Sequence, residues 1–270
     1  TEYAEKYLFR MHGIMGHRTS QNNADLRKIA SMIYMDKDAY DVNWLLGTFC
    51  WLLNRANEKN APLVEIAKKL GNGDCKYKRA GGWKNGYYYL YEYERSFAGS
   101  THAWTNENIQ QDQQIEHIMP QSRPAHWVAA WPNEDRWRES LHRLGNLVLT
   151  ENHASNMVLL VKDIAKKISD VGVAYDYDRG LLGEREITNF ANDGAGGKAW
   201  LKANILERER SMIEFALGRW RLPCCDDEGM VPLPEEFDIG DGEDAETYYV
   251  HIPPDAQCKD QVVPGHVEEE

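Results

Sequence analysis

Two short segments of the chain, 115–121 and 145–156, carry residues whose types and spacing suit the hydrolysis of a phosphodiester. Their polar members are Glu116, His117, Asn146, Asn152 and Asn156. Hydrolysis requires a base that deprotonates water and positive charge that neutralises the oxygens around phosphorus. A histidine suits the first task because its ordinary pKa lies near neutrality. Carboxylate and carboxamide oxygens are ligands that Mg²⁺ and Mn²⁺ accept.

The same segments predict the elements that position these residues. Adjacent side chains of a strand point to opposite faces, so Glu116 and His117 can share one site only where a strand ends. Pro120 predicts this end, because proline lacks the amide donor of a strand interior. The apolar run 147–149 predicts a second short strand, and 150–152 predicts the start of a helix. The predicted local order is strand, long loop, strand, helix.

The two segments resemble a known family. The resemblance lies in the motif Ile-Glu-His-Ile-x-Pro-Gln at 115–121, in the motif Leu-Gly-Asn-Leu-x-Leu at 144–149 and in the two asparagines that follow. The family is the His-Me finger (HNH) nuclease domain at the C-terminus of GmrSD-type, modification-dependent restriction enzymes. The segment 200–220 is similar to the helix that closes that domain, and 87–94 is similar to the helix that precedes it. The resemblance covers most of 85–222. It implies an α+β fold, mostly helical, with a small ββα-metal nuclease motif.

The resemblance also implies a role for each polar residue. His117 would be the general base and Glu116 a metal ligand, with Mg²⁺ or Mn²⁺ as the ion. Asn152 is the preferred helix-borne residue of the catalytic motif and metal ligand, while Asn156 is the alternative, because the spacing after Asn146 is shorter than in the family. Asn146 would be the middle residue of the catalytic motif and would tie the loop to the histidine. An ordinary turn asparagine is the other interpretation of Asn146.

The net charge of the chain has the wrong sign for binding DNA. It is −12, with a pI near 5.3, whereas DNA-binding surfaces are basic. Residues 223–270 hold 15 acidic side chains and one lysine, so the first 222 residues carry 30 basic and 28 acidic side chains. We therefore expect weak DNA affinity from this chain alone. The candidate DNA contacts are Arg123, Arg143, His153, Lys162 and Lys166.

Hydrophobic periodicity predicts helices on both sides of the motif. Apolar residues recur every three or four positions over 22–70 and again over 198–220. Helices are also predicted over 4–11, over 87–94 and over 158–168. The aromatic side chains of 87–94 suit core packing better than base stacking. The three lysines of the 158–168 helix, Lys162, Lys166 and Lys167, are placed on its exposed side.

These elements predict three parts of the chain. Residues 1–97 form a helical region, 98–222 the nuclease domain and 223–270 an acidic, flexible tail in which 248–252 is a candidate strand. The five cysteines show no zinc-binding spacing and no disulfide framework, so we expect reduced thiols. No signal-like segment opens the chain and no apolar stretch is long enough to cross a bilayer. A cytoplasmic protein without a membrane partner is expected.

The sequence therefore predicts a divalent-metal-dependent DNA endonuclease of a restriction or anti-phage defence protein. The alternative is a catalytically silent DNA-binding or regulatory module whose acidic tail contacts a partner. The chain begins at Thr1 without Met and lacks a Gly-x4-Gly-Lys-Ser/Thr phosphate-binding loop. We therefore expect the nucleotide-hydrolysing sensor domain of the resembled family to lie upstream or on a separate protein.

Overall fold

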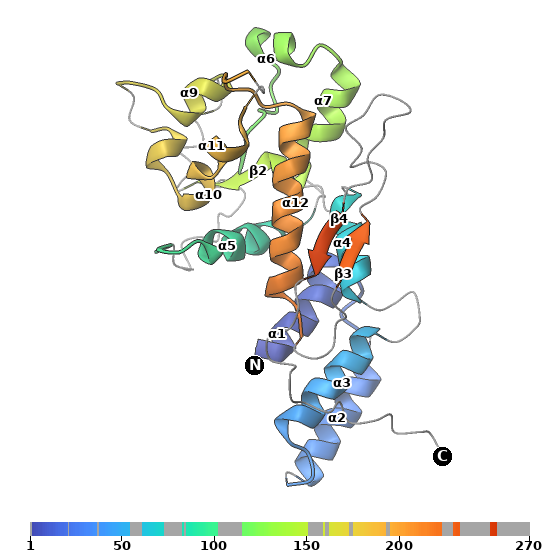
Figure 1. Ribbon diagram of the computed structural model, residues 1–270. Helices are drawn as coiled ribbons and strands as arrows, with labels where there is room; N and C mark the ends of the chain where they lie inside the picture. Colours follow the sequence, from blue (N-terminus) through green and yellow to red (C-terminus); the bar gives the residue numbers. More distant parts are fainter. Residues whose placement is uncertain are drawn as a thin grey trace. The chain divides into compact units, whose positions relative to one another are not determined.

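The structure, a computed structural model, describes most of the chain (Figure 1). The described residues are 2–20, 22–36, 38–54, 61–72, 83, 85–101, 115–150, 159, 162–172, 175–192, 195–222, 229–232 and 249–252. They form two compact units. One contains the described residues of Thr1–Leu70, Ile213–Pro234 and Thr247–Glu270, and the other those of Gly71–Met212. This division differs from the expected boundary at 97, because the helix that precedes the motif belongs to the second unit.

The first unit is built from helices and one hairpin. Its elements are α1 (Glu2–Leu8), the π-helical turn η1 (Phe9–Ile14), α2 (Asn23–Met35), α3 (Val42–Asn54), α4 (Leu63–Gly71), the end of α12 (Lys202–Arg219), β3 (Gly229–Pro232) and β4 (Tyr249–Ile252). The helices predicted over 4–11 and 22–70 are confirmed. The strand predicted in the tail is also confirmed, and β4 pairs with β3 in an antiparallel arrangement. The rest of 223–270 lies outside the described residues.

Buried polar contacts fix the N-terminal helices of this unit. The fully buried guanidinium of Arg10 donates from Nε to the carbonyl oxygen of Ala61 at 2.8 Å. The ring of Phe9 packs 4.4 Å from that of Trp220, whose Nε1 donates to Glu5 at 3.0 Å. These contacts join α1 and η1 to the segment that precedes α4 and to the residue that follows α12.

One cysteine departs from the expectation of reduced thiols. Cys50, on α3, is disulfide-bonded, and its partner lies outside the described residues. The expectation is therefore wrong for Cys50. Because the count is odd and no cysteine pair has a diagnostic spacing, the sequence offered no local signal for this bond. Among the described residues, no helix combines the length and apolar character that a bilayer crossing needs.

The second unit holds the motif. Its elements are α5 (Gly86–Ser96), β1 (Ile115–His117), α6 (Ala125–Ala130), α7 (Glu134–Leu141), the 3₁₀ turn η4 (Leu144–Asn146), β2 (Leu147–Leu149), α9 (Ile164–Ile168), the 3₁₀ turn η5 (Tyr177–Arg179), α10 (Leu182–Arg185), α11 (Ile187–Phe190) and the first part of α12. β1 and β2 form a two-stranded antiparallel sheet. The expected α+β class, mostly helical, is confirmed.

Two parts of this unit differ from the prediction. The long loop between the strands contains α6 and α7, and the side chain of Asn133 caps α7 by accepting from the amides of Asp135 and Arg136. The helix expected over 158–168 is interrupted: Leu159 is helical, residues 162–163 are not, and α9 begins at Ile164, where Asp163 accepts from the amide of Lys166 at 2.9 Å. The helix predicted to start at 150–152 lies outside the described residues.

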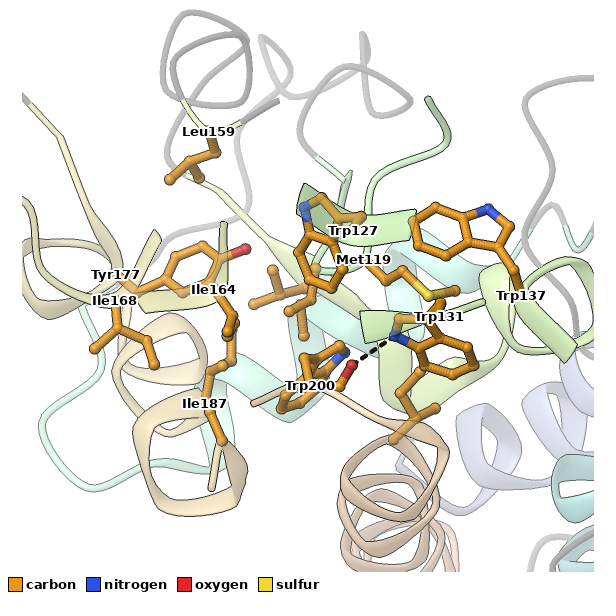
Figure 2. Close-up of a cluster of buried hydrophobic side chains, with 14 of the residues drawn as sticks. Met119, Trp127, Trp131, Trp137, Leu159, Ile164, Ile168, Tyr177, Ile187 and Trp200 are labelled. Carbon is orange, nitrogen blue, oxygen red and sulfur yellow. Dashed lines mark hydrogen bonds between the residues drawn. The ribbon is translucent and has the colours of Figure 1, made fainter. Parts of the chain in front are cut away.

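Tryptophans explain why a loop between two short strands becomes an ordered layer. Trp127 and Trp131 each meet the ring of Trp137 edge-on, with centroids 6.0 Å apart (Figure 2). Trp131 Nε1 donates to the carbonyl oxygen of Trp200 at 2.8 Å, which ties this layer to the residues just before α12 (Figure 2). All four indoles are buried, so the insertion is part of the core.

The aromatic helix α5 is also part of the core. Tyr87, Tyr89, Tyr91 and Tyr93 are buried, and α5 packs against β2. The hydroxyl of Tyr89 donates to the carbonyl oxygen of Met212 at 2.6 Å, and that of Tyr93 donates to Glu186 at 2.6 Å. The predicted core packing is confirmed for this helix, and these rings are not presented for base stacking.

The α12 helix passes beside β2 (Figure 1) and packs closely against the turn that leads into that strand. A β-carbon at Gly145 would lie 2.0 Å from the carbonyl oxygen of Ile205 and 2.9 Å from the amide nitrogen of Glu209. Arg208 Nη1 donates to the carbonyl oxygens of Gly145 at 3.0 Å and Leu147 at 2.7 Å. Glycine at 145 therefore allows a backbone-to-backbone approach that any side chain would block.

Gly145→Ala is expected to lower the free energy of unfolding by about 1–3 kcal/mol or more, because the added methyl group meets fixed backbone atoms. Gly218→Ala is the matched control, since nothing lies within 4 Å of a β-carbon there. In a helix this second change should stabilise by up to about 1 kcal/mol. Urea unfolding of both variants measures the difference. Equal effects would contradict the close packing of Gly145.

Candidate active site

The strand pair places His117 at the end of β1. Ile115 lies opposite Leu149, and His117 lies opposite Leu147. The chain then turns, and the amide of Ile118 donates to the carbonyl oxygen of Asn146 at 2.9 Å. The predicted strand end at the histidine is confirmed.

The imidazole of His117 is buried between polar groups. Its exposed fraction is 4%. Nε2 lies 3.1 Å from Nδ1 of His142, and Nδ1 lies 3.3 Å from Nε2 of Gln121. The two imidazole rings meet edge-on, with centroids 5.1 Å apart and an interplanar angle of 80°. Both ring nitrogens of His117 are therefore within hydrogen-bond distance of a side chain.

The surroundings keep His117 neutral. Burial, and then the nearby His142 and Lys167, lower the pKa of His117 to about 3. A neutral imidazole can accept a proton, which is what a general base must do. Its low pKa makes it a weak base as long as the site stays closed and dry.

The same shift predicts that acid destabilises the fold. The pKa of His117 in the folded chain lies below its ordinary value of 6.5, so the unfolded chain binds more protons between pH 6.5 and pH 3. The stability that neutral His117 contributes is complete above pH 6.5 and is lost as the pH falls towards 3. Between about pH 6 and pH 4, we expect the free energy of unfolding to fall up to about 1.4 kcal/mol per pH unit faster in the parent than in His117→Gln. Urea unfolding at several pH values measures this. Equal pH dependences of the free energy of unfolding in the parent and in His117→Gln would contradict the prediction.

Asn146 joins the segments around the histidines. It is fully buried. Its Oδ1 accepts from the amide of Met119 at 2.8 Å and from Trp200 Nε1 at 3.0 Å. Its Nδ2 donates to the carbonyl oxygens of Met119 at 3.1 Å and Leu141 at 2.8 Å. The side chain thus fixes the turn after His117, which is the tie that the resemblance implies, and it does so without facing a reacting group.

Glu116 leaves the strand on the face opposite to His117. Its carboxylate is 2% exposed and pairs with Nζ of the fully buried Lys167, which also donates to the carbonyl oxygen of His117 at 3.1 Å. Burial raises the pKa of Glu116 and lowers that of Lys167, and the opposite charge of the partner acts against each shift. Lys167 was expected on the exposed side of its helix, and that expectation is wrong.

This geometry bears on the metal ion that the resemblance implies. Glu116 is committed to Lys167 and does not point to the side of β1 that carries the imidazole. In the part of the chain that the structure describes, no three His, Cys, Asp or Glu side chains form a group that could hold a metal ion. Asn152 and Asn156 lie outside the described residues. Glu116 therefore does not fit the role of a ligand beside His117.

Two of the predicted DNA contacts are buried in ion pairs. Arg143 donates to Glu209 Oε2 at 2.7 Å and to the carbonyl oxygen of Gly71 at 2.8 Å. Lys162 donates to the carbonyl oxygen of Tyr175 at 3.2 Å, and its Nζ lies 3.3 Å from Asp170. Neither cation is presented to a phosphate, because each is committed to groups of its own unit.

The other predicted contacts have different surroundings. Arg123 is half-buried and donates to the carbonyl oxygens of Trp131 and Pro132, the latter at 3.0 Å. Lys166 is exposed on α9. His153 lies outside the described residues. Lys166 is therefore the predicted contact that the structure leaves open to solvent.

The structure adds to the site two residues that were not among the predicted site residues. His142 contacts the imidazole of His117, and Lys167 holds both Glu116 and the backbone of His117. His142 stands three residues before the Gly145–Asn146 turn, so closeness to the motif was an available signal. Lys167 is 51 residues from Glu116, and nothing in the spacing indicates that pair.

The site belongs to an α+β domain. It consists of a buried histidine at the end of a two-stranded sheet, and a long helix packs against that sheet. A comparison with protein families matches residues 65–215 to the family described as GmrSD restriction endonucleases, C-terminal domain. The match covers more than half of the 270 residues, and the chain belongs to this family. No curated protein and no solved structure matches the chain. The chain thus contains the C-terminal domain of a restriction-endonuclease family, as the motif predicts.

Proposed function

We propose that the chain is a DNA endonuclease of the HNH type in which His117 is the general base. The observation that carries the proposal is the position of a neutral imidazole at the end of β1, in polar surroundings and fixed through the turn that Asn146 holds. The histidine would take a proton from the water that attacks phosphorus.

The fixed backbone around His117 suits this task. Lys167 holds the carbonyl oxygen of His117, and Asn146 holds Met119 two residues later. An imidazole attached to a rigid turn needs little reorganisation when the substrate arrives, and such positioning contributes to the rate.

A divalent cation, Mg²⁺ or Mn²⁺, is part of the proposal. When bound, it would supply positive charge for the phosphoryl oxygens and the leaving oxygen. Glu116 is not offered as its ligand, which leaves Asn152 and Asn156 as the predicted donors. The HNH class and the cation are supported by the residues of the motif and by the chemistry of the reaction.

The matched family supports a proposal about the biological setting. We propose that the chain acts in the cytoplasm against foreign, modified DNA, together with a nucleotide-hydrolysing sensor that lies upstream or on a separate protein. Weak DNA affinity of this chain alone is consistent with its charge and with the buried ion pairs of Arg143 and Lys162.

Supercoiled plasmid incubated with Mn²⁺ or Mg²⁺, with and without EDTA, tests the proposal. We expect open-circular product with the cation and none with EDTA. An RNA of matched length, in the same assay, separates DNA from RNA as the substrate. A chain that leaves plasmid and RNA intact in both cations is not a nuclease of this type.

The second candidate is a catalytically silent module that binds DNA or a partner. The observation that favours it is the commitment of Glu116 to a structural ion pair with Lys167, which removes a carboxylate that a nuclease would use for its metal ion. It predicts a shift of labelled duplex in EDTA without any cutting in Mn²⁺. Cutting in Mn²⁺ removes this candidate.

A further inference from the structure

We propose that His142 is a positioning residue for His117. It would accept a hydrogen bond from Nε2–H of His117 and so select the tautomer in which Nδ1 of His117 receives the proton from water. The proposal rests on the proposed nuclease function. It adds a role that the motif does not assign, because the motif contains a single histidine.

The pair is built into the fold. His142 immediately follows α7, and Asn146 Nδ2 holds the carbonyl oxygen of Leu141 at 2.8 Å. The same nitrogen holds the carbonyl oxygen of Met119 at 3.1 Å. One buried side chain therefore fixes the backbone near both histidines, whose Nε2 and Nδ1 atoms lie 3.1 Å apart.

The two nitrogens of His117 have different surroundings. Nε2 faces His142, which is half-buried, at 3.1 Å, while Nδ1 faces the exposed Gln121 at the longer distance of 3.3 Å. A substrate and its water approach from solvent, so the nitrogen beside the exposed carboxamide is the one that they reach. The carboxamide can donate to the lone pair of Nδ1, which is consistent with hydrogen on Nε2.

This arrangement suits a base because a hydrogen-bonded partner orients the imidazole and stabilises its charge. Water gives its proton to Nδ1 while its oxygen forms the bond to phosphorus. The bond from phosphorus to the leaving oxygen breaks, the electron pair stays on that oxygen, and a proton from solvent neutralises it. The positive charge remains on His117, whose Nε2–H points to the lone pair of His142 Nδ1.

His142→Ala removes the acceptor, and His142→Asn restores an oxygen that can accept the same hydrogen bond. We expect His142→Ala to lower kcat for plasmid nicking by about 10–100-fold with KM nearly unchanged, since loss of a partner that orients a histidine has an effect of this order. His142→Asn should recover most of that loss. Glu139→Ala is the control, because Glu139 is exposed on α7 and should leave the rate unchanged.

The ¹⁵N chemical shifts of the His117 ring give a readout that needs no catalysis. In the parent they should show hydrogen on Nε2, and in His142→Ala they should show a mixture of the two tautomers. A parent tautomer with hydrogen on Nδ1, or a His142→Ala variant with kcat within twofold of the parent, overturns the proposal. If the parent tautomer is as expected but plasmid is not cut, the nuclease function fails while the histidine pair stands.

Discussion

His117→Ala is expected to reduce plasmid nicking in Mn²⁺ by about 10² to 10⁴-fold, which is the usual contribution of a general base. The reason is geometric, since His117 stands at the end of β1 with both ring nitrogens in hydrogen-bond distance of polar side chains. Initial rates of conversion from supercoiled to open-circular plasmid, at equal protein concentration, measure the effect.

Two controls separate lost chemistry from lost structure. Urea unfolding of His117→Ala should show a folded chain, destabilised by about 1–3 kcal/mol because the partners of the imidazole lose a hydrogen bond. His17→Ala, which removes a histidine of the other unit, should keep the parent rate. Residual cutting by His117→Ala within tenfold of the parent would exclude His117 as the base.

The parts of the site that follow from local pattern were predictable. The histidine before the Met-Pro turn predicts where the first strand ends, and β1 ends at His117. The apolar triplet after Gly-Asn predicts where the second strand begins, and β2 begins at Leu147. Helices with a clear period of three to four residues, such as α3 and α12, were predictable for the same reason, because periodicity reports burial on one face.

The partners of charged residues were not predictable. A lysine or arginine is usually exposed, and the local sequence does not show which one is buried in an ion pair. Arg143 was predicted to contact DNA and Lys167 to be exposed, yet each pairs with a buried carboxylate more than 50 residues away. The layer of α6 and α7 escaped prediction for a different reason. Each helix is too short to show a period, and its order comes from tryptophans that meet only in the fold.

The Glu116–Lys167 pair is expected to produce the largest change in stability. Lys167→Met leaves a buried carboxylate without its cation, which typically destabilises by about 3–5 kcal/mol. That is a large part of the roughly 5–15 kcal/mol that stabilises a typical domain. Lys166→Met is the matched control, since Lys166 is exposed on the same helix, and it should stay within about 0.5 kcal/mol of the parent.

The double variant Glu116→Met with Lys167→Met should recover most of the lost stability, because replacing both partners of a buried pair by apolar side chains is often neutral. The free energies of unfolding of the parent, of Glu116→Met, of Lys167→Met and of the double variant give the coupling between the two residues. Together with the Mn²⁺ affinity of Glu116→Met, they distinguish the two roles of Glu116. A metal ligand contributes to Mn²⁺ affinity, whereas an internal partner of lysine contributes to folding. If Glu116→Met weakens Mn²⁺ binding, leaves the stability unchanged and shows no coupling to Lys167, Glu116 is a metal ligand and not a structural partner of Lys167.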